Sequence, residues 1–178
     1  MAKANSRALK MLSTALQMEE KGAAFYKKAT GNCKTAQGKD IFKMLMADEL
    51  VHKQRIKKIY KTIQAGGEWS DEWKSLKVNP KKLDTLFKGL KIRHGKDMKS
   101  EITDIRAMDV GIDLELKSIT FYEKNHTRAP DAPERNFLSR MIKEERGHYR
   151  ALSDMKSYLI DPVGWFREKE RTHLDGMT

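Results

Sequence analysis

The chain has 178 residues and a net charge of +11, with 39% hydrophobic and 34% charged residues, as expected for one soluble, helix-rich domain. Its single cysteine, Cys33, excludes an internal disulfide and any cysteine-rich zinc or rubredoxin-type iron module within these residues. The charged opening MAKANSRALK and the lack of a long apolar run predict no signal peptide and no membrane span, so we expect a cytoplasmic protein.

Hydrophobic periodicity predicts a first helical hairpin, with helices over about residues 5–30 and 36–65 and a short loop that makes them antiparallel neighbours. Steps of three and four residues along each helix follow an apolar stripe with polar interruptions. The polar residues on these stripes are Glu19, Tyr26, Glu49 and His52. Ionisable side chains on a core-facing stripe cost free energy, so their presence needs a chemical reason.

Residues 66–102 form the predicted crossover to a second hairpin. The stretch NPKKLDTLFKGLKI combines an Asn-Pro start with an amphipathic pattern, so we expect the crossover to be partly helical. The basic excess of the chain precedes it and runs through it, because residues 1–99 hold 23 Lys and Arg against 10 Asp and Glu. No interleaved aromatic pattern or groove-reading motif accompanies this charge, so we predict a solvated basic face and neither a nucleic-acid nor a membrane partner.

The second hairpin, with helices over about residues 103–127 and 132–160, repeats the first. Asp131 is expected to start its second helix. The polar residues on its apolar stripes are Glu115, Tyr122, Glu145 and His148. Each lies 96 residues after its counterpart, and FYKK recurs as FYEK and DELVH as EERGH. A constant offset through two helices and their loop indicates a duplicated hairpin, and we predict an all-α antiparallel four-helix bundle.

The repeated Glu-x-x-His pattern predicts a metal centre. Residues three apart share a helix face, so Glu49 with His52, and Glu145 with His148, can each reach one point. A single such pair is ordinarily a solvent-facing contact, but two in phase with the apolar stripe at one offset are not. Four buried carboxylates would cost several kcal/mol each unless neutralised, and two divalent cations would neutralise them. Oxygen and imidazole ligands favour iron or manganese, with zinc as a substitute.

The motifs MEEKGAAFYKK and LELKSITFYEK, followed by ELVH and ERGH, resemble the rubrerythrin-like branch of the ferritin-like superfamily over nearly the whole chain. The resemblance implies a ferritin-like bundle over residues 1–160, a homodimer, and a tail, 161–178, that packs on the bundle or on a subunit interface. It implies two iron ions per chain with terminal ligands Glu19 and Glu115, bridging ligands Glu49 and Glu145, and the histidines His52 and His148. Tyr26 and Tyr122 are expected to bond a ligand carboxylate and to orient a ligand or donate a proton.

The sequence departs from the family pattern in two ways. It has no cysteines for a rubredoxin domain, so we expect an external electron-donor protein. Rubrerythrins carry an extra Glu three residues after the third-helix ligand, where this chain has Ser118, and the remaining six-ligand set resembles bacterioferritin-type centres. We expect an oxidoreductase that reduces hydrogen peroxide. The alternatives are a ferroxidase that oxidises Fe(II) with oxygen, and a non-catalytic metal-binding or DNA-binding bundle.

Overall fold

The computed structural model describes residues 2–78, 86–87 and 102–175, and within them all regular structure is helical. The elements are α1 (Ala2–Asn32), α2 (Ala36–Gln64), the short 3-10 helix η1 (Asp71–Ser75), α4 (Ile102–His126), α5 (Ala132–Ile160) and α6 (Pro162–Asp175). This confirms the predicted all-α fold class. The amphipathic stretch expected to form a crossover helix, residues 79–92, lies outside the described residues except for 86–87. None of the described helices is long and apolar enough to cross a membrane.

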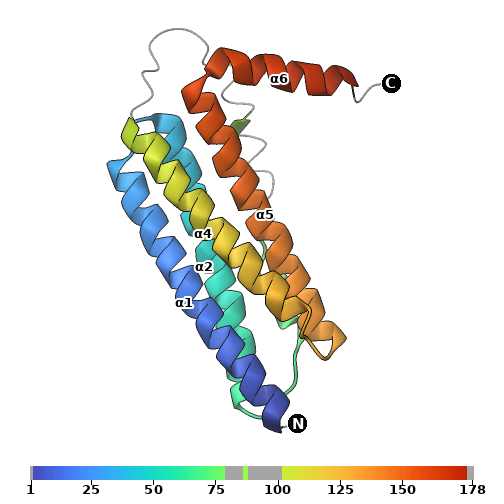
Figure 1. Cartoon of the computed structure of the whole chain (residues 1–178). Helices are drawn as coiled ribbons and strands as arrows, with labels where there is room; N and C mark the ends of the chain where they lie inside the picture. Colours follow the sequence, from blue (N-terminus) through green and yellow to red (C-terminus); the bar gives the residue numbers. More distant parts are fainter. Residues whose placement is uncertain (1, 79–85, 88–101, 176–178) are drawn as a thin grey trace.

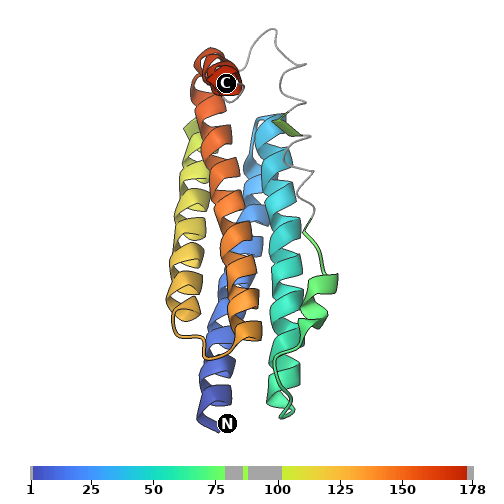
Figure 2. The ribbon, with the colours of Figure 1, turned by 90° about the vertical axis from the view of Figure 1, so that its right-hand side faces the viewer.

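The four long helices form an antiparallel bundle (Figures 1 and 2). Helices α1 and α2 pack as one hairpin and α4 and α5 as the other, while contacts of α1 with α4 and of α2 with α5 join the hairpins. Helix α6 follows α5 at one end of the bundle, contacts α5, and projects away from the other three long helices (Figure 1). The duplicated hairpins therefore face each other, which brings the polar stripes of all four helices to the middle of the molecule.

The second helix of each hairpin begins with a side-chain N-cap. The side chain of Thr35 accepts a hydrogen bond from the Gly38 amide at 3.2 Å, and Asp131 accepts one from the Glu134 amide at 2.9 Å. These caps satisfy an amide that the helix leaves unpaired. Thr35 and Asp131 are 96 residues apart, so the repeat extends to the caps, and the predicted start at Asp131 is confirmed. Asp104 at the start of α4 also accepts the Thr35 amide at 2.9 Å, which ties the first loop to the other hairpin.

The apolar core has two parts, one on each side of a polar layer at mid-length. The part nearer α6 includes Phe42, Leu45, Met108, Leu152 and Leu159. The other part includes Leu12, Ile56, Ile59, Phe137 and Leu138. Because both parts exclude water, the polar layer between them lies in a medium of low polarity, where unpaired charges are costly.

The C-terminal tail forms a helix, α6, for which the sequence pattern provided no expectation. Its start is stabilised by Pro162 at the first helical position and by Asp161, whose carboxylate accepts the Gly164 amide at 2.9 Å. Trp165 is buried, and its ring centroid lies 5.6 Å from that of Tyr158. The tail thus packs on the bundle through Trp165.

Candidate metal centre

Six ionisable side chains meet in the polar layer, and none is more than 4% exposed. They are Glu19 from α1, Glu49 and His52 from α2, Glu115 from α4, and Glu145 and His148 from α5. The structure therefore brings together all six residues that the sequence pattern singled out. They form two groups of four, in each of which the ligand atoms lie within 4.8 Å of one another. Glu49 and Glu145 belong to both groups, as bridging carboxylates must.

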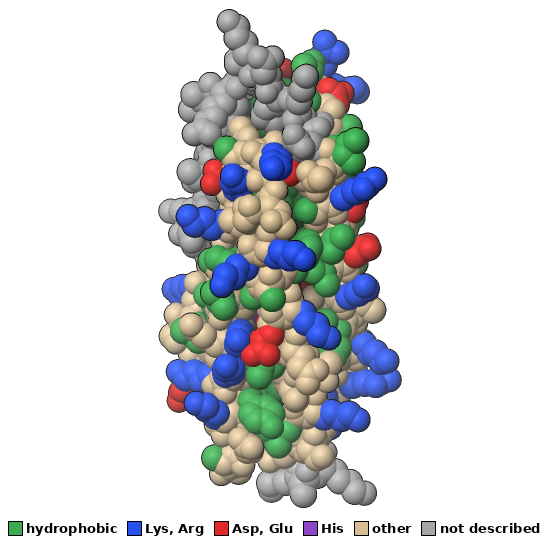
Figure 3. All heavy atoms as spheres, turned by 90° about the vertical axis from the view of Figure 1, so that its left-hand side faces the viewer, with side chains coloured by type: hydrophobic (Ala, Val, Ile, Leu, Met, Phe, Trp, Pro, Cys, Tyr) green, Lys and Arg blue, Asp and Glu red, His purple; other side chains and the backbone are tan. Residues whose placement is uncertain are grey.

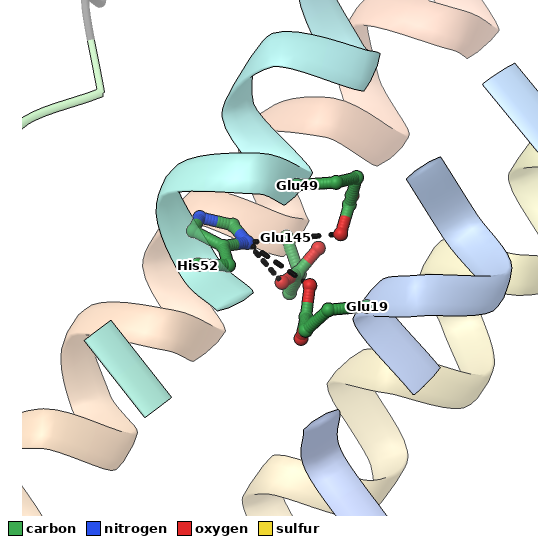
Figure 4. A group of neighbouring side chains, drawn as sticks. All are labelled: Glu19, Glu49, His52 and Glu145. Atoms are coloured by element: carbon green, nitrogen blue, oxygen red, sulfur yellow. Dashed lines mark ion pairs between the residues drawn. The ribbon is translucent and has the colours of Figure 1, made fainter. Parts of the chain in front are cut away.

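The first group is built around His52 (Figure 4). Its Nδ1 lies 3.0 Å from Glu145 Oε1 and 3.4 Å from Glu19 Oε2. Glu49 Oε2 is 3.9 Å from the same nitrogen. The three carboxylates come from three different helices, so the group exists only when both hairpins are packed together.

The second group repeats this arrangement around His148. Its Nδ1 lies 3.3 Å from Glu145 Oε2, 3.5 Å from Glu49 Oε1 and 3.6 Å from Glu115 Oε2. The rings of His52 and His148 stack with centroids 5.4 Å apart. Both Nδ1 atoms thus face the same pair of shared carboxylates.

Tyr26 and Tyr122 each hydrogen-bond one terminal carboxylate. The Tyr26 hydroxyl donates to Glu115, and the Tyr122 hydroxyl donates to Glu19. Both tyrosines are fully buried. Burial, together with the nearby carboxylates, raises the pKa of each phenol well above its ordinary value of 10.0, so both remain proton donors.

The outer nitrogen of each histidine faces a second carboxylate, which the apolar stripes of the sequence do not indicate. His52 Nε2 lies 3.0 Å from Glu144 Oε2, and His148 Nε2 lies 3.5 Å from Asp48 Oδ2. The His52 contact is a hydrogen bond, and such an outer partner fixes the orientation of a ligating imidazole and leaves Nδ1 for the metal. His148 Nε2 makes no hydrogen bond of good geometry to Asp48. Asp48 and Glu144 are themselves 96 residues apart and directly precede Glu49 and Glu145, which is the signal that could have identified them.

Arg55 makes the two halves of the centre different. This buried guanidinium donates to Glu144, and its Nε donates to the Leu76 carbonyl at 2.7 Å. Although burial opposes ionisation, hydrogen bonds from His52 and Arg55 lower the pKa of Glu144 to about 2. The residue 96 positions after Arg55 is Ala151, so Asp48 receives no equivalent support. The repeat therefore gave no signal for Arg55.

The electrostatics of the cluster show that it needs positive charge. Burial and the neighbouring Glu145 raise the pKa of Glu115 to about 8, and burial with two carboxylate neighbours also raises the pKa of Glu49. Burial would lower the pKa of His52 and His148, but the surrounding carboxylates raise it well above 6.5. Without a metal the layer thus retains protons that a bound cation would displace.

The donor atoms fit a pair of metal ions. Four of them, His52 Nδ1, His148 Nδ1 and both carboxylate oxygens of Glu145, are buried and make no hydrogen bond of good geometry. A buried polar atom without a partner costs about 1–3 kcal/mol, yet these four atoms all face one small volume. Their oxygen and imidazole chemistry, without thiolate, is that of non-haem iron, manganese or zinc sites. The cluster is therefore suited to two metal ions.

A cavity of about 460 Å³ reaches the cluster between α1 and α4. Glu49, Glu115 and Tyr26 line it on the side of the metal centre, and Gly22 and Ser118 also line it. A small molecule in this cavity can therefore approach the shared carboxylate Glu49 and the terminal carboxylate Glu115.

Comparison with known proteins agrees with this geometry. A family model described as Rubrerythrin matches residues 10–156, a stretch that contains all six clustered residues and most of the four bundle helices. No curated protein and no solved structure matches the chain. The family match covers most of the 178 residues and includes the whole candidate metal centre. The chain belongs to the rubrerythrin family.

Proposed function

We propose that this protein is a cytoplasmic non-haem di-iron oxidoreductase that reduces hydrogen peroxide to water with electrons from an external donor protein. The observation that carries the proposal is the buried cluster in which two histidine groups share Glu49 and Glu145. Two ferrous ions bound there would supply the two electrons that one peroxide molecule accepts. The reduction also consumes two protons and yields two water molecules, so the site must hold proton donors as well.

The side chains divide these tasks. Glu19 with His52, and Glu115 with His148, would each hold one ion, and the two shared carboxylates would set the separation of the pair. Tyr26 keeps its proton at neutral pH and lines the cavity through which a small oxidant enters. Its hydroxyl proton lies in the hydrogen bond to Glu115, so Tyr26 would orient that carboxylate and would give the proton to a reacting oxygen only by breaking this bond. The apolar layers on both sides exclude bulk water from the reaction.

One observation favours ferroxidase activity as the second candidate. Ser118 lines the cavity at the position where rubrerythrins carry an additional glutamate, so the carboxylates that line this cavity are those of Glu49 and Glu115. A six-ligand centre of this kind can also oxidise Fe(II) with oxygen, with iron itself as the substrate. The proposal that the chain forms a homodimer applies to both functions and is tested by sedimentation equilibrium.

A stopped-flow experiment distinguishes the two functions. The protein is loaded anaerobically with two ferrous ions per chain and mixed with hydrogen peroxide or oxygen, and ferric formation is followed by near-ultraviolet absorbance. Much faster oxidation by peroxide, with repeated re-reduction, supports the peroxidase. Faster oxidation by oxygen, with turnover of added iron, supports the ferroxidase. Glu19→Gln should abolish either reaction, whereas Glu20→Gln, which changes an exposed acid paired with Lys53 at 2.9 Å, should not.

A further inference from the structure

Two lysines that are equivalent under the repeat stand together at the cavity beside the metal centre. Lys21 on α1 and Lys117 on α4 both line the cavity and are 96 residues apart. The next residues, Gly22 and Ser118, are equivalent in the same way and also line it. The duplication therefore contributes one lysine and one small residue from each repeat to the lining of the cavity.

Neither lysine is neutralised by an acidic neighbour. Both are exposed, and no ion pair joins either to an acidic residue in the part of the chain that the structure describes. Glu20, which directly precedes Lys21, pairs instead with Lys53 at 2.9 Å. Figure 3 shows the face on which α1 lies outermost, where Lys and Arg side chains are spread widely and acidic ones are few.

The small residues keep the path from the lysines to the centre open. A Cβ atom at Gly22 would lie 3.4 Å from the Glu49 carboxyl carbon and from its Oε2. A larger side chain there would therefore cover the shared carboxylate. Because Gly22 carries none, the buried Glu49 can line the same cavity as Lys21 and Lys117.

We propose that Lys21 and Lys117 form a binding site for small inorganic monoanions at the entrance to the metal centre. This inference rests on the proposed two-metal function, because two divalent ions cancel the charge of the four carboxylates and leave the two ammonium groups uncompensated. An anion in the cavity is then attracted by the lysines, and the four ligand carboxylates no longer repel it.

The test uses azide as the probe and the Co(II)-loaded protein, whose visible spectrum reports, without redox turnover, azide that enters through the lysines and binds at the metal. Lys21→Gln/Lys117→Gln should weaken azide binding roughly fivefold at low ionic strength, and the difference should fade at high salt. The matched control is Lys28→Gln/Lys124→Gln, a second exposed pair 96 residues apart on the same two helices but not lining this cavity. The control should bind azide as the wild type does.

Three results would overturn the anion site: equal weakening in both double variants, no weakening in either, or an unchanged Co(II) spectrum when azide is added to the wild type. Failure of the proposed function is a separate result. Suppose that the protein binds azide through these lysines but that its iron-loaded form reacts with neither peroxide nor oxygen. The anion site would then be supported and the proposed function refuted.

Discussion

Tyr26 on α1 donates its hydrogen bond to Glu115 on α4, not to Glu19 on its own helix. Its counterpart Tyr122 makes the reciprocal bond to Glu19. The tyrosine of each repeat thus holds the terminal carboxylate of the other repeat. Each histidine likewise faces an outer carboxylate from the opposite hairpin. Neither hairpin can therefore assemble its half of the centre alone, which couples metal binding to the packing of the whole bundle.

This reciprocity predicts the effect of Tyr26→Phe. The change removes the hydrogen bond that orients Glu115 and should weaken binding of one of two Co(II) ions roughly tenfold, as for other outer-shell partners. Tyr122→Phe should weaken binding of the other Co(II) ion by a similar factor. Calorimetric titration of the metal-free protein measures both steps. Tyr149→Phe, at a half-buried position beside His148, is the control and should leave both unchanged. If Tyr26→Phe weakened binding of both ions equally, the assignment of Tyr26 to the ion held by Glu115 would be wrong.

Metal removal should strongly destabilise the fold. A ligand that binds only the folded state stabilises it by about 4 kcal/mol when its concentration is a thousand times the dissociation constant. Thermal unfolding with added metal or with chelator measures this difference. Glu145→Gln removes a carboxylate that both groups share and should abolish most of the metal-dependent rise in melting temperature. Glu20→Gln should preserve it, and the same loss in both variants would disprove the role of Glu145.

The fold and the grouping of the six residues could be predicted because polar residues stood at positions where the helical pattern calls for apolar ones. Ionisable residues lay in phase with the apolar stripes of the first hairpin, and the same pattern recurred 96 residues later. The pairing of Tyr26 with Glu115 could not be predicted in this way. Glu19 and Tyr26 lie on one stripe, and only the packing of the two hairpins determines which carboxylate each phenol reaches.

The burial of Arg55 could not be predicted from the sequence for a different reason. It lies within the basic run HKQRIKKIYK, where its neighbours Lys57 and Lys58 are exposed, so nothing local distinguishes it from a solvated cation. In the structure it is 1% exposed and binds Glu144 beside the metal centre. Its position across the bundle from Glu144 depends on tertiary packing, and Ala151 at the equivalent position removes the help of the repeat.

The metal-free protein should lose stability as the pH rises. The pKa of Glu115 is raised from 4.5 to about 8, so the unfolded chain releases this proton near pH 4.5 and the folded chain only near pH 8. The contribution of Glu115 to stability is therefore fully present below pH 4.5 and is lost as the pH rises from 4.5 to about 8. His52 and His148, whose pKa values are raised above 6.5, act in the same direction. Melting temperatures of chelator-treated protein between about pH 5 and 8.5 test this, and an increase across the range would refute it.

Ser118 offers a test of which chemistry the centre performs. Ser118→Glu would add a carboxylate to the cavity beside Glu49 and Glu115, at the position where rubrerythrins carry a glutamate that exchanges with a histidine as the iron changes oxidation state. We expect this variant to favour peroxide over oxygen more strongly than the wild type in the stopped-flow comparison. Ser118→Gln has nearly the same volume without the charge and is the matched control. If both variants change the preference equally, the effect is steric, and the missing carboxylate does not determine the choice of oxidant.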